Sequence, residues 1–227
     1  MTDREVAAWQ QSQIRDTWRI FRIMSEFVDG FDALSRLGPC VSVFGSARTK
    51  QENPYYEMGV EVGRLLVEHG YGVITGGGPG IMEAANKGAR EAEGISVGLN
   101  IVIPHEQDGN AYVDRDKLIN FDFFFVRKVM FVKYAQGFIV LPGGYGTLDE
   151  LFESLTLIQT GKAMRFPVVL MGTSFWGDMV NWLEGAVLGA GNISPDDPDL
   201  FSLTDDPAEA VGVIDRFYKE HALSPNF

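Results

Sequence analysis

The chain has 227 residues, a net charge of −12 and a pI of about 4.6. This acidic balance argues against binding of long nucleic acids, which depends on Lys and Arg side chains that neutralise phosphates. It does not argue against a single nucleotide. No apolar run approaches the roughly 18 residues that a membrane helix needs, and a single cysteine, Cys40, excludes an internal disulfide framework. Because residues 1–5 also lack the features of a signal peptide, we expect a cytoplasmic protein.

The N-terminal segment, residues 3–36, predicts one long helix or two shorter ones, with Gly30 as the expected break. Apolar residues recur in it at three- and four-residue steps: Ile14, Trp18, Phe21, Met24, Val28, Phe31 and Leu34. An apolar stripe of this kind must be covered. Either the sheet of the same subunit or a neighbouring subunit could cover it.

The rest of the chain alternates short apolar strands with helices. Strands are expected at residues 41–44, 71–75, 95–103, 119–125, 137–141 and 167–171. Helices are expected at residues 54–69, 81–93, 126–135, 148–159, 175–188 and 207–221. This alternation predicts an α/β fold: a doubly wound, Rossmann-like parallel sheet with helices on both faces, preceded by the N-terminal helical extension.

Three glycine-rich loops each follow a predicted strand. They are Gly45-Ser46, the run Gly76–Gly80, and the run Pro142–Gly146. In parallel sheets of this class, ligands bind beyond the carboxyl ends of the strands. Glycines let backbone N–H groups face a ligand, and a helix N-terminus adds unpaired N–H groups and a positive dipole end. The third loop in particular predicts a phosphate site.

Glu150, one turn into the helix after the third loop, allows two interpretations. Thr147-x-x-Glu150 matches a capping box, in which Glu150 would accept a hydrogen bond from the Thr147 N–H group and do no chemistry. Alternatively, Glu150 is a carboxylate beside a bound phosphorylated molecule. The run of glycines before Thr147 favours the second interpretation, because a cap does not need three glycines.

Arg127 and Lys128 form a cation pair where an apolar strand gives way to a helix. They are either surface charges or partners of an anion. The helix dipole disfavours cations at a helix N-terminus, which favours an anionic partner or ligand.

Other familiar motifs are missing. Ile81 stands where a dinucleotide fingerprint needs its third glycine, and Ala163 follows Lys162 where a P-loop needs Ser or Thr. The histidines, His69, His105 and His221, show no metal-ligand spacing, and the acidic stretch 194–199 fits no calcium loop.

Taken together, these motifs resemble those of the LOG (LONELY GUY) family, the cytokinin-activating phosphoribohydrolases. The run Pro142–Glu150 matches the family's PGGxGTxxE signature, and Arg127-Lys128 matches its Arg-Lys pair. The other two loops look like the family's other loops, so the resemblance covers about residues 41–171. Such proteins are often called "lysine decarboxylase-like", but no pyridoxal-binding signature surrounds any lysine here. The N-terminal extension and the Gly-Pro-Gly-Ile-Met-Glu sequence of the second loop resemble the bacterial branch.

The resemblance implies hydrolysis of the N-glycosidic bond of a nucleoside 5′-monophosphate, giving free base and ribose 5-phosphate. The substrate that the resemblance implies is AMP, as for an AMP nucleosidase, or an N6-modified AMP. Glu150 and Arg127 would be catalytic. The resemblance also implies a nucleotide-binding set: Gly45, Ser46, Gly77, Gly78, Gly80, Met82, Glu83, Lys128, Pro142, Gly143, Gly144, Gly146 and Thr147.

Glu83 and Asp122 are candidates for contacts with the base or the ribose, or else a helix-start acid and a strand-end polar residue. No metal or organic cofactor is implied. The family's known assemblies imply a homo-oligomer, either a dimer or an assembly of dimers. We expect a helical extension over residues 1–38 and one nucleotide-binding catalytic domain over residues 39–227. The alternative function is a non-catalytic nucleotide or molybdenum-cofactor binder on the same fold.

Overall fold

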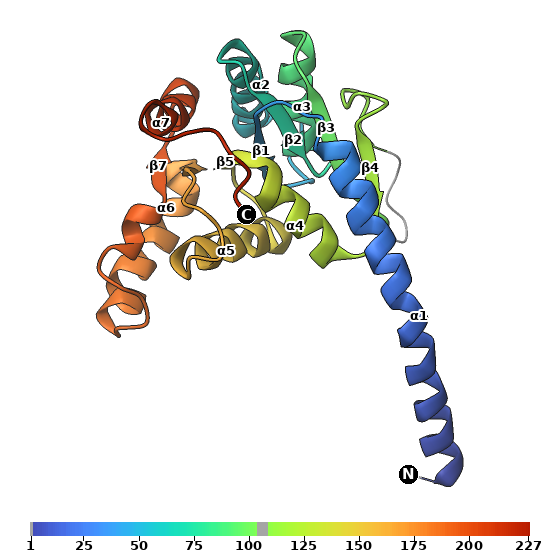
Figure 1. Cartoon of the computed structure of the whole chain (residues 1–227). Helices are drawn as coiled ribbons and strands as arrows, with labels where there is room; N and C mark the ends of the chain where they lie inside the picture. The colour runs from blue at the N-terminus through green and yellow to red at the C-terminus, as the bar shows by residue number, and fades with distance from the viewer. Residues whose placement is uncertain (1, 104–108) are drawn as a thin grey trace.

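A computed structural model describes residues 2–103 and 109–227, so Pro104 and His105 lie outside the described residues. Seven parallel strands form one sheet in the order β4-β3-β2-β1-β5-β6-β7 (Figure 1). The strands are β1 (Cys40–Phe44), β2 (Gly72–Thr75), β3 (Ser96–Ile101), β4 (Leu118–Phe121), β5 (Ala135–Val140), β6 (Val168–Met171) and β7 (Ser202–Thr204).

Helices cover both faces of this sheet, which confirms the predicted doubly wound α/β fold (Figure 1). On one face lie α2 (Pro54–Glu68), α3 (Ile81–Glu91) and α7 (Pro207–Glu220). On the other lie α1 (Asp3–Leu34), α4 (Phe124–Tyr134), α5 (Tyr145–Gln159) and α6 (Thr173–Trp182). A π-helical turn (Leu183–Val187) and a short 3₁₀ helix (Asp197–Leu200) complete the described helices. None of the described helices is long and apolar enough to cross a membrane.

Strand β1 lies at the centre of the sheet and pairs with both β2 and β5. The chain runs outward from β1 to the edge strand β4 and then returns to the centre as β5. The strand order therefore reverses between β1 and β5. Ligands of doubly wound sheets bind at such a reversal, outside the carboxyl ends of the strands.

Close packing of α2 against α3 fixes the start of α3. A Cβ atom at Gly63 would lie 2.2 Å from the carbonyl oxygen of Ala85, and one at Gly88 would lie 1.9 Å from that of Val60. Only glycine permits such an approach of two helix backbones. The first turn of α3 is thereby held beside the loop that follows β1.

The structure differs from the sequence-based expectation around β4. Strand β4 ends at Phe121 and α4 begins at Phe124, so Phe124 and Phe125 are helical and not part of a strand. A run of phenylalanines suggests a strand because aromatic side chains pack well on a sheet. Here tertiary contacts with α1, described below, override that preference. The short edge strand β7 was not expected at all.

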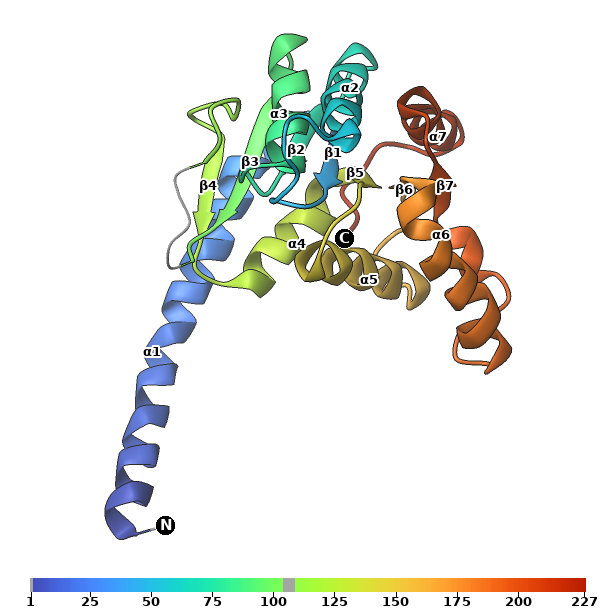
Figure 2. The same cartoon turned by 180° about the vertical axis from the view of Figure 1, so that it is seen from behind.

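Of the two predicted alternatives the structure has one long helix, α1 from Asp3 to Leu34, with no break at Gly30. A Cβ atom at Gly30 would lie 2.8 Å from Cε of Met130, so the glycine lets α1 pack closely on α4. The apolar side chains that pack on the core from α1 are those of Ile23, Phe27 and Leu34. The N-terminal part of α1 projects away from the body (Figures 1 and 2).

Most of the predicted apolar stripe is exposed on this projecting helix. The exposed members are Trp18, Phe21, Met24, Val28 and Phe31, whereas Leu34 is buried. The side chain of Ile14 lies outside what the structure describes. The sheet of the same chain therefore covers little of the stripe.

Candidate active site

The three glycine-rich loops meet at the strand reversal and are joined by backbone hydrogen bonds. Ser46, directly after β1, donates its N–H to the carbonyl oxygen of Pro142 at 2.9 Å. Its own carbonyl oxygen accepts the N–H of Ile81, the first residue of α3, at 3.1 Å. Ser46 thus connects the first loop to both of the others. The structure brings together the loops that the sequence predicted.

Several glycines of these loops are required by packing within the chain. Gly80 has a positive φ of 69°, and a Cβ atom on it would lie 2.3 Å from the carbonyl oxygen of Ser46. A Cβ atom at Gly45 would lie 2.5 Å from Cγ2 of Ile81. At Gly143 it would lie 2.1 Å from Oγ1 of Thr147. These glycines let the loops approach one another and the starts of α3 and α5.

Gly144 and Gly146 have no such requirement. An added Cβ atom at either position meets no described atom within 4 Å. Both residues lie at the N-terminus of α5, where backbone N–H groups lack intrahelical partners. Open space over an N–H-lined helix start is suited to an anion.

The capping-box interpretation of Glu150 is wrong. Helix α5 begins at Tyr145 with Gly144 as its N-cap, and no side-chain cap is present at this described end. Thr147 lies inside the first turn, so Glu150 belongs to the second turn and does not receive the N-cap N–H. The carboxylate of Glu150 therefore has no capping role in this structure.

Glu150 of α5 instead faces Arg127, which belongs to the neighbouring helix α4. Nη2 of Arg127 lies 3.9 Å from Oε1 of Glu150, and the side chains are only 14% and 5% exposed, respectively. The other carboxylate oxygen, Oε2, is buried with no hydrogen-bond partner among the described residues. The guanidinium also lies over the rings of Phe124 and Phe131, at 5.2 and 5.6 Å from their centroids. A cation and a carboxylate therefore share one shielded space.

Burial raises the pKa of Glu150 from 4.5 to about 7, although the charges of Arg127 and Lys128 lower it. The nearby carboxylates of Glu153 and Asp149 act in the same direction as burial. A carboxyl group with this pKa can both accept and release a proton near neutral pH. That property suits a general acid or base.

The ion pairs of Lys128 are with two carboxylates of α5. Its Nζ lies 2.8 Å from Oδ1 of Asp149 and 3.0 Å from Oε2 of Glu153. These ion pairs tie α4 to α5 on either side of Glu150 in the sequence. In this structure Lys128 supports the helix that carries the buried carboxylate.

Of the remaining candidates, Glu83 and Met82 lie beside the second loop, whereas Asp122 contacts α1. Oε1 of Glu83, in the first turn of α3, accepts hydrogen bonds from the Tyr56 hydroxyl (2.8 Å) and from the Gln51 amide (3.1 Å). The Met82 side chain packs beneath the second loop, since a Cβ atom at Gly78 would lie 2.8 Å from its Cε. Asp122 forms an ion pair with Arg22 of α1.

A cavity of about 460 Å³ adjoins the first loop. It is lined by Ser46, Arg48, Thr49, Lys50, Glu52 and Asn53. This depression is open to solvent, and its cations Arg48 and Lys50 outnumber the single carboxylate of Glu52. No group of His, Cys, Asp or Glu side chains within the described ranges is arranged to hold a metal ion.

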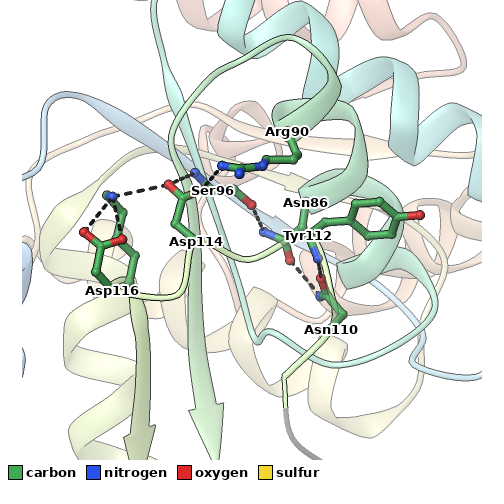
Figure 3. Close-up of polar contacts among 8 residues, drawn as sticks. Asn86, Arg90, Ser96, Asn110, Tyr112, Asp114 and Asp116 are labelled. Atoms are coloured by element: carbon green, nitrogen blue, oxygen red, sulfur yellow. Dashed lines mark hydrogen bonds and ion pairs between the residues drawn. The ribbon is translucent and has the colours of Figure 1, made fainter.

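Sequence reasoning missed a buried polar cluster under the second loop (Figure 3). Asn86, on the buried face of α3, donates its amide to Oγ of Ser96 at 2.9 Å. Its Oδ1 accepts from Oγ1 of Thr75 at 2.6 Å and from Nδ2 of Asn110 at 3.0 Å. The available signal was an asparagine among the alanines of an amphipathic helix, since a polar residue there needs buried partners.

Asn110 fastens the segment before β4 onto the second loop (Figure 3). Its N–H donates to the carbonyl oxygen of Gly77 at 2.7 Å, and its Nδ2 also donates to that of Gly78 at 2.9 Å. Further along, Asp114 pairs with Arg90 of α3 at 2.8 Å. The segment before β4 is therefore tied to the second loop at Asn110 and to the last turn of α3 at Asp114.

The comparisons with known proteins show the family of this chain. A family model described as "Possible lysine decarboxylase" matches residues 82–214, which include Arg127 and Glu150. The cytokinin riboside 5′-monophosphate phosphoribohydrolase of Mycobacterium tuberculosis is 32% identical over 161 residues, covering 68% of this chain and 82% of that protein. The chain belongs to the LOG family.

Two further relatives of this LOG-family chain extend the comparison. The rice (Oryza sativa subsp. japonica) protein named cytokinin riboside 5′-monophosphate phosphoribohydrolase LOG is 30% identical over 185 residues, 79% of this chain and 73% of that protein. The molybdenum cofactor binding protein of Rippkaea orientalis has a solved structure with a TM-score of 0.58 and 24% identity, covering 80% of this chain and 98% of its own. That structural likeness shows the fold alone.

The burial of Glu150 predicts that Glu150→Gln stabilises the protein at alkaline pH. The pKa of about 7 lies above the unfolded value of 4.5, so the folded state loses stability as pH rises from about 4.5 to 7 and stays lower above that. The free energy of unfolding falls by an amount on the order of 3 kcal/mol over this pH range. The variant should therefore melt several °C higher than the wild type at pH 8, with no such gain at pH 4.

The neighbouring substitution Asp149→Asn is the matched control, because its half-exposed carboxylate pairs with Lys128 and should give no gain at pH 8. Thermal unfolding followed by circular dichroism measures all three proteins. A lower melting temperature for Glu150→Gln at pH 8 would mean that the charged carboxylate is fully compensated in the folded state.

Proposed function

We propose that this protein hydrolyses the N-glycosidic bond of a nucleoside 5′-monophosphate, AMP or an N6-modified AMP, to free base and ribose 5-phosphate. The observation that carries this proposal is the buried Glu150–Arg127 pair. The names of the relatives from M. tuberculosis and rice, both phosphoribohydrolases, support it.

We place the 5′-phosphate at the N-terminus of α5. The first turn of α5 has no acidic residue, whereas the first turn of α3 carries Glu83. A negative side chain at a helix N-terminus competes with a bound anion for the positive dipole end. The open space over Gly144 and Gly146 supports the same placement.

Glu150 is then one helical turn beyond the phosphate, near the ribose. As the bond from C1′ to the base nitrogen breaks, positive charge develops on the ribose, and a nearby carboxylate stabilises it. The oxygen of one water bonds to C1′ and one of its protons passes to Glu150. The departing base takes up a proton from solvent, and Glu150 afterwards releases its proton to solvent. A pKa of about 7 keeps Glu150 able to accept that proton.

Arg127 contributes positive charge on the other side of this space. It can stabilise negative charge that leaves with the purine, or it can hold the nucleotide. A fall in kcat after Arg127→Ala indicates the first role, and a rise in KM at constant kcat indicates the second.

A non-catalytic nucleotide or molybdenum-cofactor binder on the same fold is the alternative, because a protein named a molybdenum cofactor binding protein shares the fold. Such a binder has no need of a buried carboxylate of raised pKa beside an arginine. The Glu150–Arg127 pair therefore favours the enzyme.

The catalytic proposal predicts release of free adenine when the protein is incubated with AMP. Glu150→Gln and Arg127→Ala should each lower turnover at least roughly 100-fold. In the wild type, kcat should fall about tenfold per pH unit below about pH 7, as Glu150 becomes protonated. Chromatography of the products over a pH series measures both effects.

The control is Asp196→Asn, which removes an exposed carboxylate from the acidic turn before β7 and should keep wild-type turnover. Near wild-type turnover by Glu150→Gln, with the protein folded, would remove Glu150 from the mechanism.

The phosphate placement predicts that adenosine is a very poor substrate, with kcat/KM lower by several orders of magnitude, because phosphate binding energy positions the ribose. Gly146→Ala should leave the fold intact, since no described atom clashes with the new methyl group. That group would occupy the space assigned to the phosphate and should lower kcat/KM for AMP at least about tenfold.

The matched control is Gly177→Ala, which adds a methyl group in similarly open space on α6 and should leave kinetics unchanged. Equal rates for AMP and adenosine would show that the loop does not bind the phosphate.

We also propose that the protein is a homo-oligomer, a dimer or an assembly of dimers, and that α1 contributes to the contact. Trp18, Phe21 and Val28 are 72%, 62% and 65% exposed along one helix, although such side chains normally avoid water. A second copy presents the same stripe, so the two can cover each other in a two-fold arrangement.

Light scattering should therefore give the wild type a mass of at least twice 25.1 kDa. The double substitution Trp18→Glu and Phe21→Glu should lower that mass without unfolding the chain, because neither side chain packs on the core. Ala33→Glu adds a charge at another exposed position of α1 and should not change the mass. A monomeric wild type would contradict the oligomer, and an unchanged mass for the double variant would move the contact off α1.

A further inference from the structure

The start of α4 lacks a cap from its own sequence. Its N-cap residue is Phe123, whose apolar side chain cannot accept a hydrogen bond from the first-turn N–H groups. The N–H of Arg127 donates to the carbonyl oxygen of Phe123 at 3.2 Å, which is the first hydrogen bond of the helix. Arg127 therefore belongs to the turn that frays most readily when a helix end is uncapped.

Glu26 of α1 caps part of this helix start across a long sequence distance, through the N–H of the N-cap residue Phe123 and that of Asp122 before it. Its Oε1 accepts the N–H of Asp122 at 2.9 Å, and its Oε2 accepts the N–H of Phe123 at 3.2 Å. Arg22, one turn earlier on α1, forms an ion pair with Asp122, and its guanidinium lies 6.0 Å from the centroid of the Phe123 ring. Figures 1 and 2 both show α1 running past the start of α4.

These contacts hold both backbone N–H groups with one carboxylate at the positive end of a helix. Hydrogen bonds from backbone N–H groups to a carboxylate are charge-assisted and stronger than those to a neutral acceptor. The negative charge also offsets the unfavourable position of Arg127 and Lys128 near that helix end.

We propose that Glu26 is a positioning residue for Arg127: by capping α4 it fixes the distance between the guanidinium and the carboxylate of Glu150. The proposal rests on the proposed function and adds to it a residue that lies outside the glycine-rich loops. Catalysis is sensitive to such placement, since a shift of about 1 Å can lower a rate roughly 100-fold. The N-terminal helix is thereby part of the catalytic apparatus.

The test compares Glu26→Ala, Glu26→Gln and the control Asp29→Asn in the full-length protein. Glu26→Ala removes both acceptors, whereas Glu26→Gln keeps one carbonyl oxygen and can retain one of the two hydrogen bonds. Asp29 lies on the same helix, and its described hydrogen bond is to Ser25, not to α4. The control thus removes the same charge without touching α4.

For AMP hydrolysis below the melting temperature, we expect kcat to fall at least about tenfold in Glu26→Ala and less in Glu26→Gln. KM should change less than kcat, because the phosphate contacts of α5 are untouched, and Asp29→Asn should match the wild type. Titration with ribose 5-phosphate gives the fraction of competent sites, so that kcat refers to folded protein. Wild-type kcat in Glu26→Ala, or a loss explained entirely by fewer competent sites, would overturn the proposal.

A second readout does not depend on activity. Arg127 lowers the pKa of Glu150, so displacement of Arg127 should raise that pKa in Glu26→Ala but not in Asp29→Asn. Carboxyl ¹³C NMR of Glu150 measures the shift. If the wild type released no adenine from AMP, the proposed function would fail, while this titration would still show whether Glu26 positions Arg127. An unchanged Glu150 pKa in Glu26→Ala would contradict the positioning role.

Discussion

The parallel pairing of β1 with β5 brings together two points of the chain that are almost one hundred residues apart in the sequence. The loops that leave these strands emerge side by side, and β2 adds the second loop from the other side of β1. Ser46 then joins the loops through its backbone alone. Because backbone groups and a few tightly packed glycines fix the geometry, Gly144 and Gly146 remain open to a ligand.

The same topology explains how a cation reaches this edge from the other face of the sheet. Helix α4 connects the edge strand β4 to the central strand β5, and its first turn lies at the carboxyl edge, where Arg127 meets Glu150. At 3.9 Å the pair attracts but does not use up the hydrogen-bonding capacity of the carboxylate. The carboxyl group of Glu150 is buried there with a raised pKa, so its ionised form lowers the stability of the folded state. Ionisable groups with strongly shifted pKa values are common at functional sites.

The fold class and the three loops could be predicted because their signals are local. A strand, a glycine turn and a helix follow one another within about fifteen residues, and each signal is visible in a short window. The cap on α4 could not be predicted, since Glu26 and Asp122 become neighbours only when α1 docks. The capping interpretation of Thr147 is wrong for a local reason, because α5 begins at Tyr145 with Gly144 as its N-cap, one turn earlier than expected.

The N-terminal helix shows why a stripe of large apolar residues can indicate the wrong face. The face of α1 that packs on the body combines the side chains of Ile23, Phe27 and Leu34 with the close approach of Gly30 to Met130 and the contact of Glu26 before α4. The more conspicuous stripe, with Trp18 and Phe21, points outward. One rigid helix would then hold a subunit contact on one side and the first turn of α4 on the other. Given both proposals, assembly would restrict the motion of α1 and so favour the conformation in which Arg127 faces Glu150.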